Sequence, residues 1–309
     1  MKTVIKSAKS TSWSMRFADF KEITKVRLAV SVVFSSIAGY LLGANEISLV
    51  VLLLLAFGGY CMVGASNAYN QIIEKDLDAL MKRTRNRPMP SGRMSVNLGL
   101  TIAIVLTVLG VVSLYFVNPK TAMFGAISIF LYTSVYTPLK TVTPLSVFVG
   151  AFPGAIPFML GWVAATDEFG IEPGTLFMIQ FFWQFPHFWA LAWMLDEDYR
   201  KGGFKLLPTG EKDKATALQI IMYTIWMMVI SVVPVLGITG RLQLSIPAAV
   251  IIFIMGGVML FFAFRLYDKR DNTSARRLML ASVTYITFMQ LVYVLDKYIV
   301  SLFMVVWGR

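Results

Sequence analysis

Apolar runs of about twenty residues recur along almost the whole chain, and they constrain its fold more than any other feature. A helix of about 20 apolar residues crosses the hydrocarbon core of a bilayer, because each residue advances the helix by about 1.5 Å. With 57% hydrophobic and only 15% charged residues, the chain is not an ordinary soluble domain. The pattern predicts nine spans, at residues 26–43, 47–69, 96–117, 121–139, 144–165, 174–195, 216–238, 245–264 and 279–298.

No linker or low-complexity tract separates these runs. We therefore predict one domain over residues 1–309, an all-α integral membrane protein whose spans form one bundle around a central cavity facing the cytoplasm. Residues 1–24 are polar and basic, lack the apolar core of a cleavable signal peptide, and are expected to form a cytoplasmic segment. Cys61, the only cysteine, falls inside a predicted span, so no intrachain disulfide can form.

The basic residues predict the orientation of the bundle. All but four of the 28 Lys and Arg residues fall on one side of the predicted spans. The four exceptions are Lys120, Arg241, Lys297 and Arg309. By the positive-inside rule, the N-terminus and the loops at about 70–95 and 196–215 face the cytoplasm, and the C-terminus lies outside. The net charge of +11 is thus explained by the basic residues that orient the chain in the membrane, and we expect no nucleic-acid partner. We expect the protein in the cytoplasmic (inner) membrane.

The loop of residues 70–95 holds acids and bases at the end of a predicted span. If the span continues as a helix, Asn70, Glu74 and Asp78 recur every four residues on one stripe, and Asp76 lies roughly opposite Glu74. An amide and two carboxylates are hard oxygen ligands of the kind that Mg²⁺ binds together with substrate phosphate and water. The alternative is an ordinary charged helix end at the membrane surface.

A second polar stripe leaves the span at 174–195. Gln184, His187 and Asp198 share one helix face, whereas Asp196 points the other way. Ionisable residues within a span usually face the bundle interior and serve a function. His187, the only histidine, could contact haem, transfer a proton, bind a metal, or remain a neutral hydrogen-bonded imidazole. Zinc is disfavoured, because no cysteine or second histidine accompanies it.

Basic residues on the same side of the membrane could bind phosphate oxygens through guanidinium and ammonium groups. These residues are Arg83, Arg85, Arg87, Lys140, Lys25 and Arg27. Lipid headgroups are the alternative partner for any one of them. Acids suited to a metal lie among these bases, which favours a diphosphate over lipid alone.

The pattern N-x-x-x-[DE]-x-x-x-D followed by M-K-R-T-R-N-R-P-M-P-S-G resembles the first acidic motif of the UbiA-type intramembrane prenyltransferases. Within that superfamily, Y-T-P-L-K, W-Q-F-P-H-F-W-A-L-A-W and D-Y-R-K-G-G-F-K-L-L-P resemble the protohaem IX farnesyltransferases, or haem O synthases. The resemblance extends from about Lys25 to Leu207. It implies a helix bundle that transfers the farnesyl group of farnesyl diphosphate to a vinyl group of haem B, with addition of water.

The resemblance also implies roles for individual residues. The implied Mg²⁺ ligands are Asn70, Glu74, Asp78 and Asp198. The implied catalytic residues are Asp78, Asp198, His187 and Tyr199. The implied diphosphate-binding residues are Arg27, Arg83, Arg87, Lys140 and Lys201. The implied haem-binding residues are His187 and Gln184.

The expected cofactor is Mg²⁺, and haem B is expected as a substrate. The expected partners are farnesyl diphosphate, haem B, the lipid bilayer, and haem A synthase or terminal oxidase assembly factors.

Two other functions fit part of this pattern. A UbiA-type prenyltransferase acting on an aromatic quinone precursor would have no need of His187 or of the segment after it. A carrier or transporter of anionic isoprenoids would bind the diphosphate without Mg²⁺-dependent cleavage, so release of pyrophosphate would exclude it.

Overall fold

The computed structural model describes residues 13–307, and over that part of the chain all regular elements are helical. The elements are α1 (Trp13–Thr24), α2 (Val26–Gly43), α3 (Leu49–Ile73), α4 (Lys75–Leu80), α5 (Val96–Tyr115), α6 (Pro119–Phe130), the π-helix η1 (Leu131–Tyr136), α7 (Thr137–Leu139), α8 (Ser146–Thr166), α9 (Ile171–Lys201), α10 (Lys214–Ile230), the 3₁₀-helix η2 (Val233–Leu236), α11 (Ile246–Lys269) and α12 (Asn272–Trp307). Residues 1–12 of the predicted cytoplasmic segment and Arg309 lie outside the described residues.

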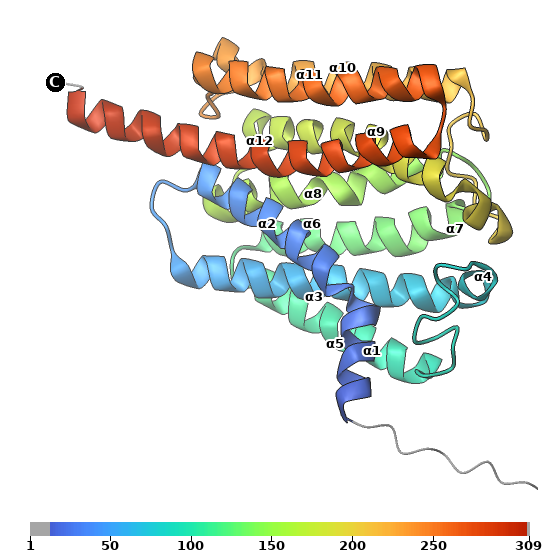
Figure 1. Cartoon of the computed structure of the whole chain (residues 1–309). Coiled ribbons are helices and arrows are strands. Elements are labelled where there is room, and N and C mark those ends of the chain that lie inside the picture. The colour runs from blue at the N-terminus through green and yellow to red at the C-terminus, as the bar shows by residue number, and fades with distance from the viewer. Residues whose placement is uncertain (1–12, 308–309) are drawn as a thin grey trace, which may run out of the picture.

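The long helices run roughly side by side in two groups (Figure 1). α2, α3, α5, α6 and α8 pack against one another, and α9 to α12 form the second group. α8 packs along α9, and α12 contacts both α9 and α2, so two seams join the groups. α8 and α9 therefore occupy the middle of the bundle, where side chains of both groups meet.

Eight helical segments are long and apolar enough to cross a membrane, and each overlaps one predicted span. They are Val26–Gly43, Leu49–Ile73, Val96–Tyr115, Pro119–Leu139, Ser146–Thr166, Lys214–Leu236, Ile246–Lys269 and Asn272–Val300. The prediction of an all-α, multi-pass membrane protein is thus confirmed.

The ninth predicted span, residues 174–195, lies inside α9 and falls outside that set because Gln180, Gln184 and His187 interrupt its apolar sequence. α9 is packed against α8, α10 and α12, which shields these polar groups from lipid.

Glycines let α2 and α8 approach closely within the first group of helices. A Cβ on Gly39 would lie 2.0 Å from the backbone oxygen of Phe158, and one on Gly161 would lie 1.9 Å from that of Ser36. Small residues at such contacts are typical of membrane helices, whose association depends on close packing. Alanine at either position would push the two helices apart.

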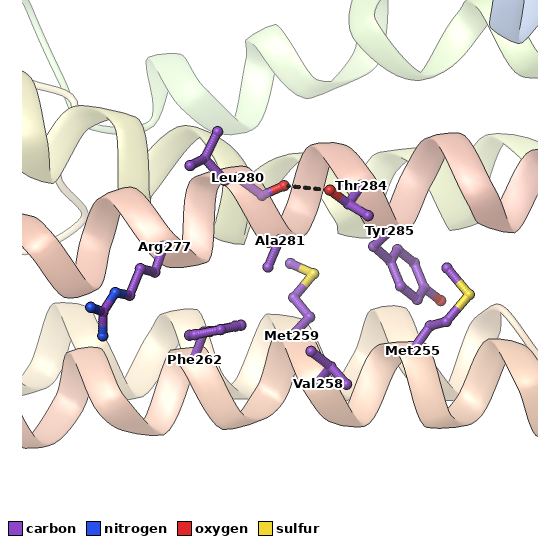
Figure 2. Close-up of a pocket in the computed structure, with 9 residues that line it drawn as sticks. All are labelled: Met255, Val258, Met259, Phe262, Arg277, Leu280, Ala281, Thr284 and Tyr285. Carbon is purple, nitrogen blue, oxygen red and sulfur yellow. Dashed lines mark hydrogen bonds between the residues drawn. The ribbon is translucent and has the colours of Figure 1, made fainter.

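Two grooves lie on the sides of the bundle. One, of about 620 Å³, is lined by α3, α5, α6 and η1 and ends at Ile73 and Pro138. The other, of about 420 Å³, lies between α11 and α12, with Arg277 at one end (Figure 2). Neither groove is lined by the acids of the two polar loops. The central cavity and the cytoplasmic orientation of the loops stay predictions.

The two polar loops meet at one end of the bundle, where α4 and α7 also lie (Figure 1). The backbone N–H groups of Lys82 and Arg83, after α4, donate to the carboxylate of Asp198, near the end of α9. The N–H of Lys205 donates to the carbonyl oxygen of Lys140 at 2.7 Å, which ties the loop after α9 to the turn after α7. Three segments far apart in sequence thus form one polar layer.

Candidate active site

The acids of the first loop lie on a helix that is broken once. α3 ends at Ile73, and Glu74 joins it to α4 with φ −92° and ψ 7°. Backbone hydrogen bonds from Glu74 to Asn70 and from Asp78 to Glu74, 2.9 and 2.7 Å long, continue across this break. The three residues therefore stay on one side and are all buried, whereas the side chain of Asp76 is 92% exposed. The structure has the stripe that the spacing predicted.

Each buried carboxylate of this stripe is paired with a base. The Oε1 of Glu74 lies 2.8 Å from the Nζ of Lys140, and the Oδ2 of Asp78 lies 2.7 Å from an Nη of Arg87. The Oδ1 of Asp78 is buried and has no hydrogen-bond partner among the described residues. An unpartnered buried carboxylate oxygen is unfavourable by itself, so this atom fits a bound cation.

Lys140 follows the π-helix η1 and the short α7, which carry its side chain into the bundle. Its Nζ lies 4.6 Å from the ring centre of Tyr136 and 5.6 Å from that of Phe204. Burial by itself lowers the pKa of Lys140, but the Glu74 carboxylate outweighs it and the pKa is raised. Lys140 is therefore charged at neutral pH.

Lys25 joins α1 to α2 in a left-handed conformation, with φ 48° and ψ 58°. Such a backbone costs a non-glycine residue roughly 1 kcal/mol or more, and it is often kept for function. Burial and the nearby charges of Arg87 and Lys140 lower the pKa of Lys25 to about 7. Arg27, two residues later, is exposed. The base from this segment that faces the acid stripe is thus Lys25, in place of the predicted Arg27.

The second loop contributes Asp198, whose two carboxylate oxygens accept hydrogen bonds from the backbone of the first loop. Oδ1 accepts from Lys82 N–H at 2.7 Å, and Oδ2 accepts from Arg83 N–H at 3.1 Å. Burial opposes ionisation, but these two donors outweigh it and lower the pKa of Asp198. The Arg83 guanidinium lies 5.7 Å from the ring centre of Tyr199. Asp198 thus links the loops directly.

Other acids and bases of the second loop stay apart from the stripe. Asp196 pairs with Arg200 at 2.9 Å, one turn along α9. Lys201, predicted to bind diphosphate, is exposed and lies close enough to Asp198 to favour its charged form. No three Asp, Glu, His or Cys side chains cluster as a ready metal site anywhere in the described part of the chain. The structure brings Asn70, Glu74 and Asp78 together, and Asp198 is joined to the loop that follows them through the backbone of Lys82 and Arg83.

His187 and Gln184 contact different helices. The Nδ1 of His187 lies 2.8 Å from the Oγ of Ser282 on α12, and its ring stacks on Trp183 at 4.8 Å. Gln184 donates to the carbonyl oxygen of Ala151 on α8 at 2.8 Å. The two predicted haem-binding side chains are therefore not brought into contact, although they leave α9 within one turn of each other.

The sequence profile of the UbiA prenyltransferase family matches residues 32–292. The chain belongs to this family. Protoheme IX farnesyltransferase of Flavobacterium psychrophilum is 68% identical over 92% of this chain and 95% of its own length. That of Christiangramia forsetii is 67% identical over 91% of this chain and 94% of its own, and that of Koribacter versatilis is 34% identical over 90% and 93%. The predicted family and the prenyltransferase class are confirmed.

Solved structures of membrane-associated synthases and of UbiA homologues share this fold. A structure of digeranylgeranylglyceryl phosphate synthase covers 91% of this chain and 98% of its own, with a TM-score of 0.74 at 18% identity. A UbiA homologue from Archaeoglobus fulgidus bound to GPP and Mg²⁺ covers 89% of this chain and 99% of its own, with a TM-score of 0.64 at 14% identity. At these identities the likeness establishes the fold alone.

The candidate site holds more positive than negative charge. The charges of Arg87, Lys140 and Arg83 all act on Lys25. Arg87 and Lys140 each pair with one of the two buried carboxylates. Sequence spacing pointed to the buried acids, but it could not choose between Lys25 and Arg27. The choice depends on the junction between α1 and α2, because Lys25 has a left-handed backbone there and Arg27, on α2, is exposed.

Proposed function

We propose that this protein is a protohaem IX farnesyltransferase. It transfers the farnesyl group of farnesyl diphosphate to a vinyl group of haem B and adds water, which gives haem O. The observation that carries the proposal is the identity of 67–68% with two relatives of that name over at least 91% of this chain. The geometry of the polar layer supports it, because buried carboxylates beside surplus bases suit a diphosphate.

Lys25, Arg87 and Lys140 bind the diphosphate in this proposal, with Arg83 at the edge of the site. Glu74 and Asp78 hold Lys140 and Arg87 in place through ion pairs of 2.8 and 2.7 Å. Lys140 and Arg87 are thus fixed before the substrate arrives. Preorganised charge of this kind stabilises the negative charge that develops on a departing diphosphate, at no cost of reorganisation during the reaction.

Mg²⁺ fits the acid stripe, and Asp78, Glu74 and Asn70 would hold it together with oxygens of the diphosphate. The free Oδ1 of Asp78 is the atom that supports this assignment. When bound, the ion would supply Lewis-acid neutralisation of the leaving group. Asp198 stays a predicted ligand, since both of its oxygens accept backbone hydrogen bonds here.

The groove along α3 is suited to the farnesyl chain. It extends from Met62 to Ile73, next to Glu74, which corresponds to about 16 Å along the helix. Its lining is mostly apolar, and its other wall ends at Pro138, two residues before Lys140. A chain lying there would place its first carbon, which bears the diphosphate, beside the acid stripe.

The reaction breaks the bond between the first farnesyl carbon and the diphosphate oxygen, and the oxygen keeps the electron pair. The π electrons of the haem vinyl group then form the new carbon–carbon bond. Water adds to the resulting cation beside the porphyrin ring and loses a proton. Tyr136 and Phe204, close to Lys140, can limit the access of bulk water to the first cation.

The cytoplasmic orientation of both loops stays part of the proposal, as do contacts with haem A synthase or terminal oxidase assembly factors. His187 is proposed to bind the haem acceptor. Gln184, which faces α8, is left with a packing role against Ala151 and Gly154.

The test is product analysis with the purified full-length protein in liposomes that contain haem B, farnesyl diphosphate and Mg²⁺. We expect mass spectrometry to detect haem with an added hydroxyethylfarnesyl chain. Asp78→Ala should lower the rate by roughly 10²–10³-fold, whereas the matched variant Asp76→Ala, at the exposed acid, should act like wild type.

Two results would overturn the proposal. One is prenylation of an aromatic quinone precursor in place of haem, which would favour the other UbiA-type activity. The second is binding of farnesyl diphosphate without release of pyrophosphate in the presence of either acceptor, which would favour a carrier.

A further inference from the structure

Ser282 on α12 holds two aromatic side chains of α9 at once. Its carbonyl oxygen accepts a hydrogen bond of 2.7 Å from the Nε1 of Trp183. Its Oγ lies 2.8 Å from the Nδ1 of His187. The two rings lie one helical turn apart and stack with their centres 4.8 Å apart and their planes at 18°. One buried residue therefore sets the position of both rings.

The hydrogen bonds of Ser282 also set the proton of the imidazole. Its Oγ donates to the carbonyl oxygen of Met279 at 2.7 Å, one turn back along α12. A hydroxyl has one proton, so the same Oγ can only accept from His187. The hydrogen on this ring thus lies on Nδ1, and Nε2 keeps its lone pair.

The Nε2 of His187 has no hydrogen-bond partner in the described part of the chain, and it is not among the atoms that are buried without a partner. Nε2 is therefore not fully buried, and no protein group among the described residues occupies its lone pair. A neutral imidazole with one nitrogen tied as a donor and the other free is the usual arrangement of a metal-binding histidine.

We propose that Ser282 is a positioning residue that presents the Nε2 lone pair of His187 to the iron of the haem acceptor. The inference rests on the proposed function. It adds Ser282 as a residue that controls the contact between His187 and the haem iron. The ring of Trp183, stacked on the imidazole, prevents His187 from turning away.

The group that accepts the hydrogen bond from His187 Nδ1 affects how strongly Nε2 can bind a metal. Carboxylates hydrogen-bonded to a ligating histidine raise its basicity and strengthen the bond to the metal. A neutral serine hydroxyl that already donates elsewhere is a weaker acceptor than a carboxylate. His187 would thus bind the haem iron in a fixed position but not tightly, as suits a substrate that must leave after each turnover.

The test uses the purified full-length protein in detergent, titrated with haem B and followed by visible absorption and by resonance Raman spectroscopy of the ferrous form. His187→Ala should abolish the iron–histidine stretching band. Ser282→Ala should weaken haem binding about tenfold or more, the range seen when partners of ligating histidines are lost, and should shift that band. Ser282→Thr, which keeps the hydroxyl, should restore both.

Thr284→Ala is the matched control. Thr284 also donates to a carbonyl oxygen of α12, that of Leu280 at 3.1 Å, but it faces the groove beside α11 (Figure 2). It should leave haem binding and the band unchanged. Circular dichroism shows whether each variant is folded, and Ser282→Thr keeps the inference testable if Ser282→Ala is not.

Three outcomes separate this inference from the proposed function. If His187→Ala removes the band and Ser282→Ala changes neither band nor affinity, the role of Ser282 is refuted. If the wild type makes haem O and His187→Ala leaves the spectrum unchanged, ligation by His187 is refuted and the activity stands. If no farnesylated haem forms in the liposome assay, the proposed function itself fails.

Discussion

Replacing Lys140 by methionine should destabilise the protein strongly, and the loss should be recovered by a second substitution. The Nζ of Lys140 lies 2.8 Å from Glu74, and the two side chains are only 10% and 5% exposed. Removing the lysine would leave a buried carboxylate without its counter-charge. Loss of one partner of a buried pair costs about 3–5 kcal/mol. We therefore expect the unfolding equilibrium to shift by roughly 10²-fold or more.

The double variant Glu74→Gln with Lys140→Met removes both charges, and a neutral pair of similar volume is often about as stable as the ion pair. It should regain most of the lost stability. It should still form haem O far more slowly than wild type, because a base that binds the diphosphate is gone. Adding Glu74→Gln to Lys140→Met should thus restore stability but not turnover.

The measurement is unfolding in mixed micelles titrated with dodecyl sulfate and followed by tryptophan fluorescence, with haem O formation assayed in parallel. Lys205→Met, at an exposed base near Lys140, is the control and should unfold like wild type. The reasoning is refuted if Lys140→Met unfolds at the wild-type midpoint, or if the double variant is no more stable than the single one.

Three further predictions concern the same polar layer. Because the pKa of Lys25 is lowered to about 7, Lys25 is charged below pH 7 and must take up a proton to bind an anion above it. Affinity for farnesyl diphosphate should therefore fall by up to about tenfold per pH unit above 7, and calorimetry of Lys25→Arg should show a flatter profile; an unchanged slope would contradict this. Arg27→Ala should keep turnover within about twofold of wild type, as is usual for exposed sites, and a large loss would restore its predicted role in diphosphate binding. Asp198→Ala should raise the KM for farnesyl diphosphate by loosening the loop of Arg83, with Asp196→Ala as the control; a raised requirement for Mg²⁺ would instead support Asp198 as a metal ligand.

The sequence predicted the parts of the site that depend on local spacing, but not the parts that depend on long-range contacts. The positions of Asn70, Glu74 and Asp78 on one stripe, and of Asp76 off it, follow from helix geometry alone. The partners of those acids do not, because Glu74 and Lys140 are 66 residues apart and nothing local brings them together. The hydrogen bonds from the backbone of Lys82 and Arg83 to Asp198 have no sequence signal, since any residue has an N–H.

For the fold, too, the sequence predicted local features better than the packing between helices. The apolar runs predicted nine spans, and eight of them correspond to helices that are long and apolar enough to cross a membrane. The ninth lies in α9, whose glutamines and His187 lower its apolar character. Helical periodicity placed Gln184 and His187 on one face of the predicted helix. Three residues on a helix differ by about 300° in direction, so their side chains are about 60° apart, which is enough for one to reach α8 and the other α12. Which helix lies beside α9 on each side is a property of the assembled bundle.

The surplus of bases around Glu74 and Asp78 connects the lifetime of the protein to its substrate supply. Like charges held close together favour local opening, and an anion that binds only the folded form stabilises it by about 2.7 kcal/mol when present at a hundred times its Kd. In a membrane short of prenyl diphosphate, a larger share of the molecules would be open and within reach of proteases. The amount of enzyme would then follow the amount of its precursor without any separate regulator.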